Sequence, residues 1–388
     1  MDIQILLSRI SREMIFWMAW IIIPLIMEIL PAIGGLFILL KKNIYQKIVR
    51  CRTTHSEITL IIPVYNSADS LRACLESVYQ SDYPVSLLDV LLINNGSTDN
   101  SFEVFTQCQA EFKDLPMTWL NASQGKAKAL NLALFNSHGK YIIHIDSDGK
   151  LHRDALKNMA DRFEQQPDTI CLTGAILTDM IEIERTKGFI FKLIRRCEFF
   201  EYCQSFLVGR NIESEFNNIY TLSGAFSAFR KSGIMKSQMY NSSTVSEDTQ
   251  VTFQMREKGQ VRLCENAFFF VDPVESYNKL YTQRQRWQRG EIEVSHMFLK
   301  NDLNIGGFFS NFMVRVLLYD HTFAFPRLIW FFALIFLVFL NYPMSLVLGS
   351  VVIIYLLYCL SMLLFFFNVI IYLSSVKDIS KYYRSKWY

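Results

Sequence analysis

The feature that constrains the fold most is an apolar run at residues 141–145, which ends directly in an Asp-Ser-Asp-Gly segment. A β-branched run of this length predicts a buried strand. Open α/β sheets bind ligands at the carboxyl ends of their strands, and side chains two positions apart there point the same way. Asp146 and Asp148 therefore predict a site for Mg²⁺ or Mn²⁺, since both ions prefer oxygen ligands and complete their shells with water and phosphate. Taken alone, such a segment is more often an acidic turn that binds nothing, so its neighbours along the chain decide.

Composition narrows the class of protein. A chain of 388 residues has room for two or three domains. Of these residues 51% are hydrophobic, including 32 Phe, and the apolar excess lies at the two ends. The net charge of +3 gives no sign of a nucleic-acid partner, and we expect none. The eight cysteines form no Cys-x-x-Cys pair, which argues against a zinc site or a disulfide framework and fits a reducing compartment.

The N-terminal apolar stretch predicts a membrane span. Residues 15–40 carry one charge, Glu28, and as a helix they would extend about 39 Å, enough to cross a hydrocarbon core of about 30 Å. The basic residues that follow at 41–52 place this end in the cytoplasm by the positive-inside rule. A signal peptide is one alternative, although the apolar run is long for one. A broken interfacial helix ahead of Pro31 is the other.

The C-terminal part predicts further membrane segments. Residues 303–325 are aromatic and apolar but interrupted by charges, which indicates an interfacial segment. Residues 328–340 form the core of a second span and residues 344–373 a third. At about 45 Å the third is too long for one upright helix, so part of it is loop, tilt or overhang. Basic residues follow from Lys377 onward and fit a cytoplasmic end.

Between the two ends, the pattern is that of a soluble α/β unit. Buried strands are predicted at residues 58–62, 90–93 and 141–145; a turn and a helix follow each of the first two, and a further helix opens at residues 124–131 before the third. Strands that alternate with helices predict a mostly parallel sheet with its loops on one edge. Lys126 lies at the start of one of these helices, where a cation opposes the helix dipole, so we expect an anion nearby.

Four segments in this unit resemble the nucleotide-binding half of the family 2 glycosyltransferases: PVYN at 63–66, NNGSTDN at 94–100, GKAKALN at 125–131 and DSD at 146–148. The resemblance implies an α/β GT-A fold with a Rossmann-like sheet and a nucleotide-diphospho-sugar donor. It also implies a divalent metal on Asp146 and Asp148, and places Lys126 by the diphosphate. The residues that would hold the donor are Pro63, Val64, Tyr65, Asn66, Asn95, Lys126 and Asp146.

The following half supplies an acceptor wall and a base by the same resemblance. Ser223 and Gly224 begin a small-residue and aromatic stretch, 223–230, that resembles the acceptor side of the family; a tight turn beside a helix is the alternative. Glu247 and Asp248 open a helix predicted to end at Gly259. An acidic pair there acts in general as cap and dipole partner. The resemblance instead implies that Asp248 is the catalytic base, with Glu247 beside it.

The most specific motif is Gln-x-x-Arg-Trp at residues 283–287. On a helix Gln283 and Arg286 share a face, and Trp287 lies one turn from Gln283. A guanidinium can bind a phosphate through two donors, and an indole stacks on a sugar ring or a cation. A basic amphipathic helix on anionic lipid is the alternative, and both can hold. The motif resembles that of cellulose, hyaluronan and poly-N-acetylglucosamine synthases.

The resemblance covers residues 57–290 and departs from the family at the nucleotide pocket. Ser67 stands where many relatives have glutamate, and Asn94 and Asn95 stand where many have two aspartates. An asparagine oxygen still accepts a hydrogen bond but brings no charge. The expected function is inverting, metal-dependent transfer from a UDP-sugar to a growing polysaccharide or glycan. Transfer of one sugar to a lipid or glycan acceptor is the first alternative, because three spans are few for a channel. A non-catalytic membrane subunit is the second.

These expectations divide the chain into five parts: a transmembrane segment (1–41), a GT-A domain (42–300) with a nucleotide-binding half (57–150) and an acceptor half (151–300), an interfacial segment (301–325), and two transmembrane helices with a basic tail (326–388). We expect a multi-pass protein of the cell membrane with a cytoplasmic catalytic domain. The whole pattern also resembles a Gram-positive subset of the family that accompanies an exosortase-like membrane protein. Expected partners are therefore the donor, a glycan or lipid-linked acceptor, membrane lipid, and an exosortase-like or polysaccharide-export protein.

Overall fold

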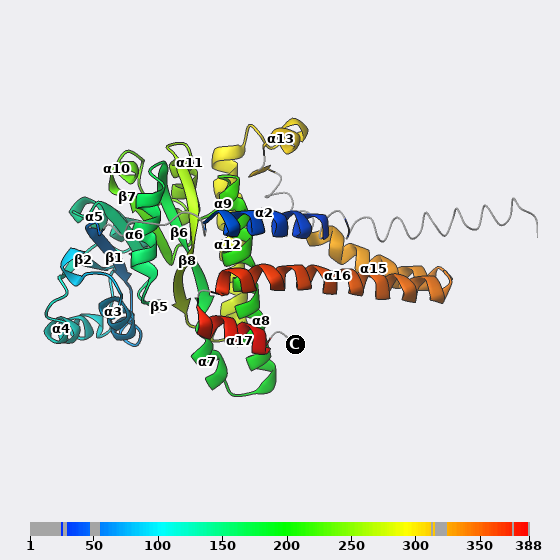
Figure 1. Ribbon diagram of the computed structural model, residues 1–388, viewed down its shortest axis with the longest axis horizontal. Coiled ribbons are helices and arrows are strands. Elements are labelled where there is room, and N and C mark those ends of the chain that lie inside the picture. Colours follow the sequence, from blue (N-terminus) through cyan, green and yellow to red (C-terminus); the bar gives the residue numbers. More distant parts are fainter. Residues whose placement is uncertain are drawn as a thin grey trace, which may run out of the picture. The chain divides into compact units, whose positions relative to one another are not determined.

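The computed structural model describes residues 25, 29–46, 55–311, 313–314, 324–374 and 376–386. The chain divides into two compact units, which we call the sheet unit and the helical unit (Figure 1). The sheet unit extends to Asn301 and takes up the chain again at Tyr372. The helical unit holds the chain up to Ile48 and the segment Asp302–Ile371. Each unit is described by itself below.

The helical unit contains the apolar segments. Its helices are α2 (Leu30–Gln46), α13 (Ile305–Ser310), α15 (Ala324–Phe339) and α16 (Met344–Leu373). Among the described residues, α16 alone is both long and apolar enough to cross a bilayer. The prediction that part of residues 344–373 could be a loop is wrong, since one continuous helix of 30 residues covers that range. Residues 15–24 and 26–28 of the predicted span 15–40 lie outside the described residues, as do residues 315–323 of the interfacial segment.

The sheet unit is built on one sheet of eight strands in the order β3-β2-β1-β4-β7-β6-β8-β5 (Figure 1). Strands β3, β2, β1 and β4 are parallel to one another, as are β6 and β8. Strand β7 is antiparallel to β4 and β6, and β5 is antiparallel to β8. The prediction of a mostly parallel α/β sheet is therefore confirmed. The strands are β1 (Ile58–Val64), β2 (Leu88–Asn94), β3 (Met117–Asn121), β4 (Tyr141–Ile145), β5 (Gly149–Leu151), β6 (Thr169–Thr178), β7 (Phe226–Arg230) and β8 (Gln260–Val271).

Helices lie on both faces of this sheet (Figure 1). Helix α5 packs on β1 and β2, and α6 packs on β6 and β8, and each helix buries apolar residues against the sheet. The helix predicted to end at Gly259 ends earlier, at Arg256. The helices of the unit are α3 (Leu71–Tyr79), α4 (Ser101–Glu111), α5 (Lys126–Asn136), α6 (Ala155–Gln165), α7 (Met180–Arg185), α8 (Phe189–Tyr202), α9 (Arg210–Glu215), α10 (Lys231–Ile234), α11 (Glu247–Arg256), α12 (Tyr277–Leu299) and α17 (Lys377–Lys386), with a π-helical turn η3 (Cys203–Gly209) between α8 and α9.

Helix α17 packs on α8 within the sheet unit. The Phe199 ring meets that of Tyr382 edge-on, with centroids 5.1 Å apart, and the Phe200 ring meets that of Tyr383 at 5.1 Å. The Tyr382 hydroxyl donates to Glu184 Oε1 at 3.0 Å. A segment that follows the apolar helix α16 in the sequence is thus part of the unit that carries the sheet.

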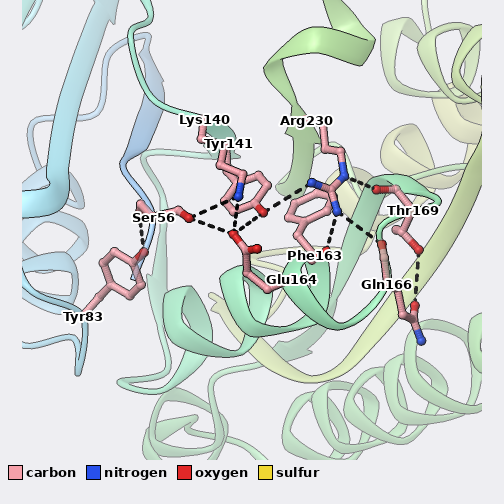
Figure 2. A network of polar contacts seen from close by, with 9 residues as sticks. All are labelled: Ser56, Tyr83, Lys140, Tyr141, Phe163, Glu164, Gln166, Thr169 and Arg230. Carbon is pink, nitrogen blue, oxygen red and sulfur yellow. Dashed lines mark hydrogen bonds and ion pairs between the residues drawn. The ribbon is translucent and has the colours of Figure 1, made fainter. Parts of the chain in front are cut away.

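A polar network fastens the sheet edge where β1, β4 and β6 begin and β7 ends (Figure 2). Glu164, near the end of α6, accepts from Ser56 Oγ at 2.8 Å, from Lys140 Nζ at 2.5 Å and from Tyr141 Oη at 2.6 Å. Arg230 donates to the backbone oxygens of Phe163 and Gln166, at the end of α6, and to that of Thr169, the first residue of β6. The stretch 223–230 therefore ends in a structural arginine, far along β7 from its glycine.

Candidate functional site

The loops after β1 and β2 are joined to each other by hydrogen bonds. Because the two strands are parallel with Val64 beside Asn94, their carboxyl ends lie at one edge. Asn95 N donates to Val64 O at 2.8 Å, and Asn66 N donates to Ser97 Oγ at 3.1 Å. Asn66 adopts a left-handed backbone, φ 48°, which asparagine tolerates better than most residues. Residues 63–66 and 94–100 thus form one rigid pair of loops.

The Asn95 side chain links this pair to the start of α5. Its Oδ1 accepts from the backbone N–H of Gly125 at 2.6 Å, immediately before Lys126. Gly125 has φ 130°, a conformation that favours glycine. Tyr65, in contrast, is 51% exposed beside the loops. The predicted donor-binding residues therefore come together, with Asn95 holding the loop that leads to the lysine.

Lys126 and Asp146 form the charged centre of the edge. Lys126 Nζ lies 2.5 Å from Asp146 Oδ1 and donates to Gly224 O at 3.3 Å. Burial opposes the charge of Lys126, but Asp146, Glu247 and Asp248 together outweigh burial and raise its pKa. Burial likewise opposes the charge of Asp146, yet Lys126 and His144 hold the pKa of that carboxyl well below its usual range. The anion predicted beside Lys126 includes the chain's own aspartate.

Asp148 fits a divalent cation. Its side chain keeps an open edge to solvent, while the surrounding protein and the charge of Asp146 raise its pKa to about 6. Two carboxylates that disfavour each other's charge offer hard oxygen ligands to a cation. Among the described residues, no three His, Cys, Asp or Glu side chains gather into a complete metal cage. This donor set suits an ion such as Mg²⁺ that takes its remaining ligands from water and a phosphate.

Two serines lie beneath the aspartates. Ser67 Oγ is 2.7 Å from Ser147 Oγ, and both residues are buried. The backbone N–H of Ser67 donates to Ser101 Oγ at 3.0 Å, which holds the residue in place. The departure from glutamate at position 67 therefore leaves a neutral hydroxyl pair that fixes the middle of the Asp-Ser-Asp segment.

Asp248 is held at one oxygen and faces Gly224 with the other. Its Oδ1 accepts from Ser246 Oγ and from Thr249 N, each at 2.8 Å. A Cβ on Gly224 would lie 2.7 Å from Asp248 Oδ2, so only glycine fits there without displacing the carboxylate. Gly224, Glu247 and Asp248 line one small pocket, with His144 of β4 among its other walls. Burial is the largest cause that raises the pKa of Glu247.

The Gln-x-x-Arg-Trp residues lie on α12, close to the start of α11. A Cβ on Gly290, three residues after Trp287, would collide with Ser246 Cβ. Arg286 is exposed, whereas Gln283 Oε1 is buried without a hydrogen-bond partner in the described part of the chain. The Trp287 ring is covered by Arg284, whose Cζ lies 4.5 Å from its centroid. The helix that carries this motif therefore packs against the residue that precedes α11, two positions before the predicted base.

Sequence reasoning missed two buried residues at this site, His144 and Arg210. His144 Nε2 lies 3.4 Å from Asp146 Oδ1, and burial lowers the pKa of its imidazole. Arg210 is 6% exposed and donates to Ser223 Oγ. The position of His144 could be predicted in part, since it lies on β4 two residues before Asp146, which directly follows that strand. No pattern in the sequence singled out Arg210.

Comparison with known proteins agrees with this geometry. Residues 59–237 match the model of glycosyl transferase family 2. This segment of the sheet unit is thus similar to the family 2 glycosyltransferases. The chain is 24% identical over 278 residues to a poly-β-1,6-N-acetyl-D-glucosamine synthase of Staphylococcus epidermidis, covering 70% of this chain and 64% of the relative. The same values hold for the synthase of Staphylococcus aureus strain MSSA476. The chain thus spans less than two thirds of the length of these curated relatives.

Solved structures share the fold. The mannosyltransferase PcManGT of Pyrobaculum calidifontis, in complex with GDP-Man and Mn²⁺, has a TM-score of 0.60 at 16% identity, covering 92% of this chain and 98% of that one. S. aureus TarS 1–349 in complex with UDP-GlcNAc has a TM-score of 0.50 at 16% identity, covering 68% and 71%. At such identities the likeness establishes the α/β fold of the GT-A type.

Proposed function

We propose that this protein transfers a sugar from a UDP-sugar to a hydroxyl of a growing polysaccharide or glycan, with inversion at the anomeric carbon. The observation that carries the proposal is that Lys126 and Asp248, from two different motifs, both meet Gly224. Lys126 donates to its carbonyl oxygen at 3.3 Å, and the open space at its Cα is bounded by Asp248 Oδ2. Lys126, a cation that can bind a diphosphate, and Asp248, a carboxylate that can act as a base, thus lie on either side of Gly224.

Asp248 is the proposed base. With Oδ1 fixed by Ser246 and Thr249, Oδ2 is the oxygen left to take a proton from an acceptor hydroxyl. That hydroxyl then attacks the anomeric carbon from the face opposite the diphosphate, so one displacement inverts the centre. Glu247, whose pKa burial raises, stands beside the base as a second acidic group.

Asp146 and Asp148 would hold Mg²⁺ or Mn²⁺, and such an ion would supply positive charge to the leaving diphosphate. Lys126 adds a positive charge at the same place, where charge develops in the transition state. Arg286, exposed on α12, would add another. The fold neighbour with bound Mn²⁺ supports a divalent ion, and the donor set here accepts either metal.

The donor would lie over the joined loops after β1 and β2. Asn66 and Asn95 fix those loops. The exposed ring of Tyr65 can stack on the nucleobase of the donor. Pro63 and Val64 end β1 beneath them. The fold neighbour in complex with UDP-GlcNAc and the poly-N-acetylglucosamine synthases support UDP-GlcNAc as the first donor to test.

The acceptor side would comprise Ser223, Gly224, Gln283 and Trp287. The names of the curated relatives support a polymer, so chain extension is the proposed outcome, and transfer of one sugar to a lipid or glycan acceptor is the alternative. Helix α16 supports attachment to the cell membrane with the sheet unit in the cytoplasm. A multi-pass topology, contact with membrane lipid, and an exosortase-like or polysaccharide-export partner belong to the same proposal.

Release of UDP by membranes that contain the protein tests the proposal. A panel of UDP-sugars would be supplied with Mn²⁺, Mg²⁺ or EDTA. We expect metal-dependent release with one donor, a roughly 10²–10⁴-fold loss in Asp248→Asn, and a loss of metal response in Asp148→Asn. The exposed Asp114→Asn serves as matched control and keeps full activity.

The same experiment separates the alternatives. A product limited to one added sugar favours the single-transfer reading over chain extension. Binding of UDP without turnover, under every metal and acceptor condition, favours a non-catalytic membrane subunit. Failure to bind any nucleotide, with or without metal, would end the transferase proposal.

A further inference from the structure

Two arginines are buried in the sheet unit, and they differ in their partners. Arg162, 8% exposed, forms an ion pair with Glu265 at 2.8 Å. Arg210, 6% exposed, has no carboxylate within ion-pair distance among the described residues. Its guanidinium instead donates to Ser223 Oγ and lies 4.5 Å from the centroid of the Phe206 ring.

Such an arrangement is costly. Removing a charge from water without an ion-pair partner is strongly unfavourable, and one hydroxyl with one ring offsets little of that. Burial accordingly lowers the pKa of Arg210 to about 10, although Glu213, Asp248 and Glu291 act against burial from a greater distance. The side chain still carries its charge at neutral pH. Arg162 shows the opposite, since its partner Glu265 outweighs burial and raises its pKa.

The contacts of Arg210 lead to three parts of the site. Ser223 precedes Gly224, which lies against Asp248 Oδ2 and accepts from Lys126. Ser223 is itself 2% exposed, and its backbone N–H donates to Thr173 Oγ1 at 2.9 Å, so its side chain points inward to the arginine. On the other side, Phe206 meets the Trp287 ring edge-on with centroids 6.1 Å apart.

We propose that Arg210 is a positioning residue for sugar transfer. It fixes the turn at Ser223 and Gly224 against Asp248, and through Phe206 it supports Trp287. Because Arg210 is buried behind Ser223, it acts through these neighbours and does not touch the substrates. The inference deepens the proposed function and rests on it for the role of Asp248.

Kinetics of Arg210→Gln and Arg210→Lys test the inference in the full-length protein. Loss of the charge leaves the loops after β1 and β2 unchanged, so we expect the affinity for UDP and the KM for the donor to stay within about threefold. The kcat for transfer should fall roughly 10–100-fold, because the base and the acceptor wall lose their alignment. Arg210→Lys keeps the charge and should recover part of that loss.

Arg162→Lys is the matched control, since it is also buried but keeps an ion pair with Glu265. It should lower the Tm without lowering kcat at temperatures where the protein stays folded. A merely structural role for Arg210 predicts the same behaviour, and an unchanged kcat in folded Arg210→Gln would therefore overturn the inference.

A double-mutant cycle with Ser223→Ala adds an independent test of the path. If Arg210 acts through Ser223, the double variant loses no more kcat than the worse single variant. Losses that multiply instead mean that the two residues act separately, which contradicts the proposal.

Amide hydrogen exchange separates failure of this inference from failure of the proposed function. In Arg210→Gln we expect faster exchange in residues 221–226 and unchanged exchange in residues 58–66. This readout needs no turnover, so it tests the positioning even if the wild type transfers no sugar. Unchanged exchange in residues 221–226 would overturn the positioning role whatever the activity.

Discussion

At the scale of single residues, the site depends on one missing methyl group. Gly224 leaves room for Asp248 Oδ2, and the opposite oxygen of that carboxylate is held by Ser246 and Thr249. The carboxylate therefore cannot rotate aside without breaking two hydrogen bonds. A side chain at position 224 acts on the proposed base directly.

We therefore predict that Gly224→Ala lowers the rate of transfer roughly 10–100-fold while UDP binding persists. UDP release and UDP affinity, measured on the same preparation, check this. Gly233→Ala is the control, because the nearest atom to a Cβ there is Ile170 Cβ at 3.5 Å, an ordinary contact. Equal activities of the two variants would contradict the close packing of Gly224 on the base.

Most residues at this scale were predictable from chemistry and resemblance. Asp146, Asp148 and Lys126 follow from carboxylates after a strand and a lysine at a helix start, and they do lie together. Arg210 could not be predicted, because its importance comes from what surrounds it. A cation in a sequence is solvated by default, and only packing shows that this one is not.

At the scale of elements, α6 is fastened to the sheet by charge. Glu164 accepts three hydrogen bonds that outweigh the opposing effect of burial and lower its pKa to about 2 from an ordinary 4.5 (Figure 2). Arg230 donates hydrogen bonds to the carbonyl oxygens at the end of the same helix. A cation there also interacts favourably with the negative end of the helix dipole.

Glu164→Gln should lower the free energy of unfolding by about 1–3 kcal/mol at neutral pH. Because the folded pKa lies below the unfolded one, the carboxylate stabilises the fold above pH 4.5 and loses this contribution as the pH falls toward about 2. Thermal melts of wild type and variant over that range check the sign. The gap between the two melting curves should close as the pH falls, and a constant gap would contradict the role of the charge.

Three strands were predicted from apolar runs, but length did not decide which ones, because the long strands β6 (10 residues) and β8 (12 residues) were not predicted. The strands expected at 58–62, 90–93 and 141–145 exist as β1, β2 and β4. Strand β3, which is partly exposed at the edge, and β5, three residues long, had no expected counterpart. Such strands form because an adjacent strand supplies hydrogen-bond partners. The pattern of apolar residues in the short segment itself does not reveal that adjacent strand.

At the scale of the whole molecule, the sheet unit is closed by a segment that follows α16. Tyr383 is 4% exposed between α17 and α8, and its ring contacts those of Phe199 and Phe200. The sequence analysis placed these residues in a basic tail beside the membrane helices. The sequence did not show that one face of α17 is buried, because the basic residues of this short segment obscure its few apolar positions.

Tyr383→Ala should destabilise the sheet unit by about 3–5 kcal/mol, since it removes a buried ring. Tyr382→Phe removes only the hydroxyl that donates to Glu184 and should cost about 1 kcal/mol. Thermal unfolding in detergent, followed by loss of UDP binding, ranks the two. Tyr281→Ala, at a ring that is 69% exposed, is the control and should leave the melting temperature unchanged.

The placement of α17 on α8 also orders events at the ribosome. Synthesis of the stretch between Tyr202 and Lys377 takes on the order of 10–30 s at about 5–20 residues per second. During that interval Phe199 and Phe200 have been made but their partners have not. The nascent domain therefore carries an uncovered aromatic surface until α17 has been translated, and a message truncated within α16 would yield a protein prone to aggregate through that surface.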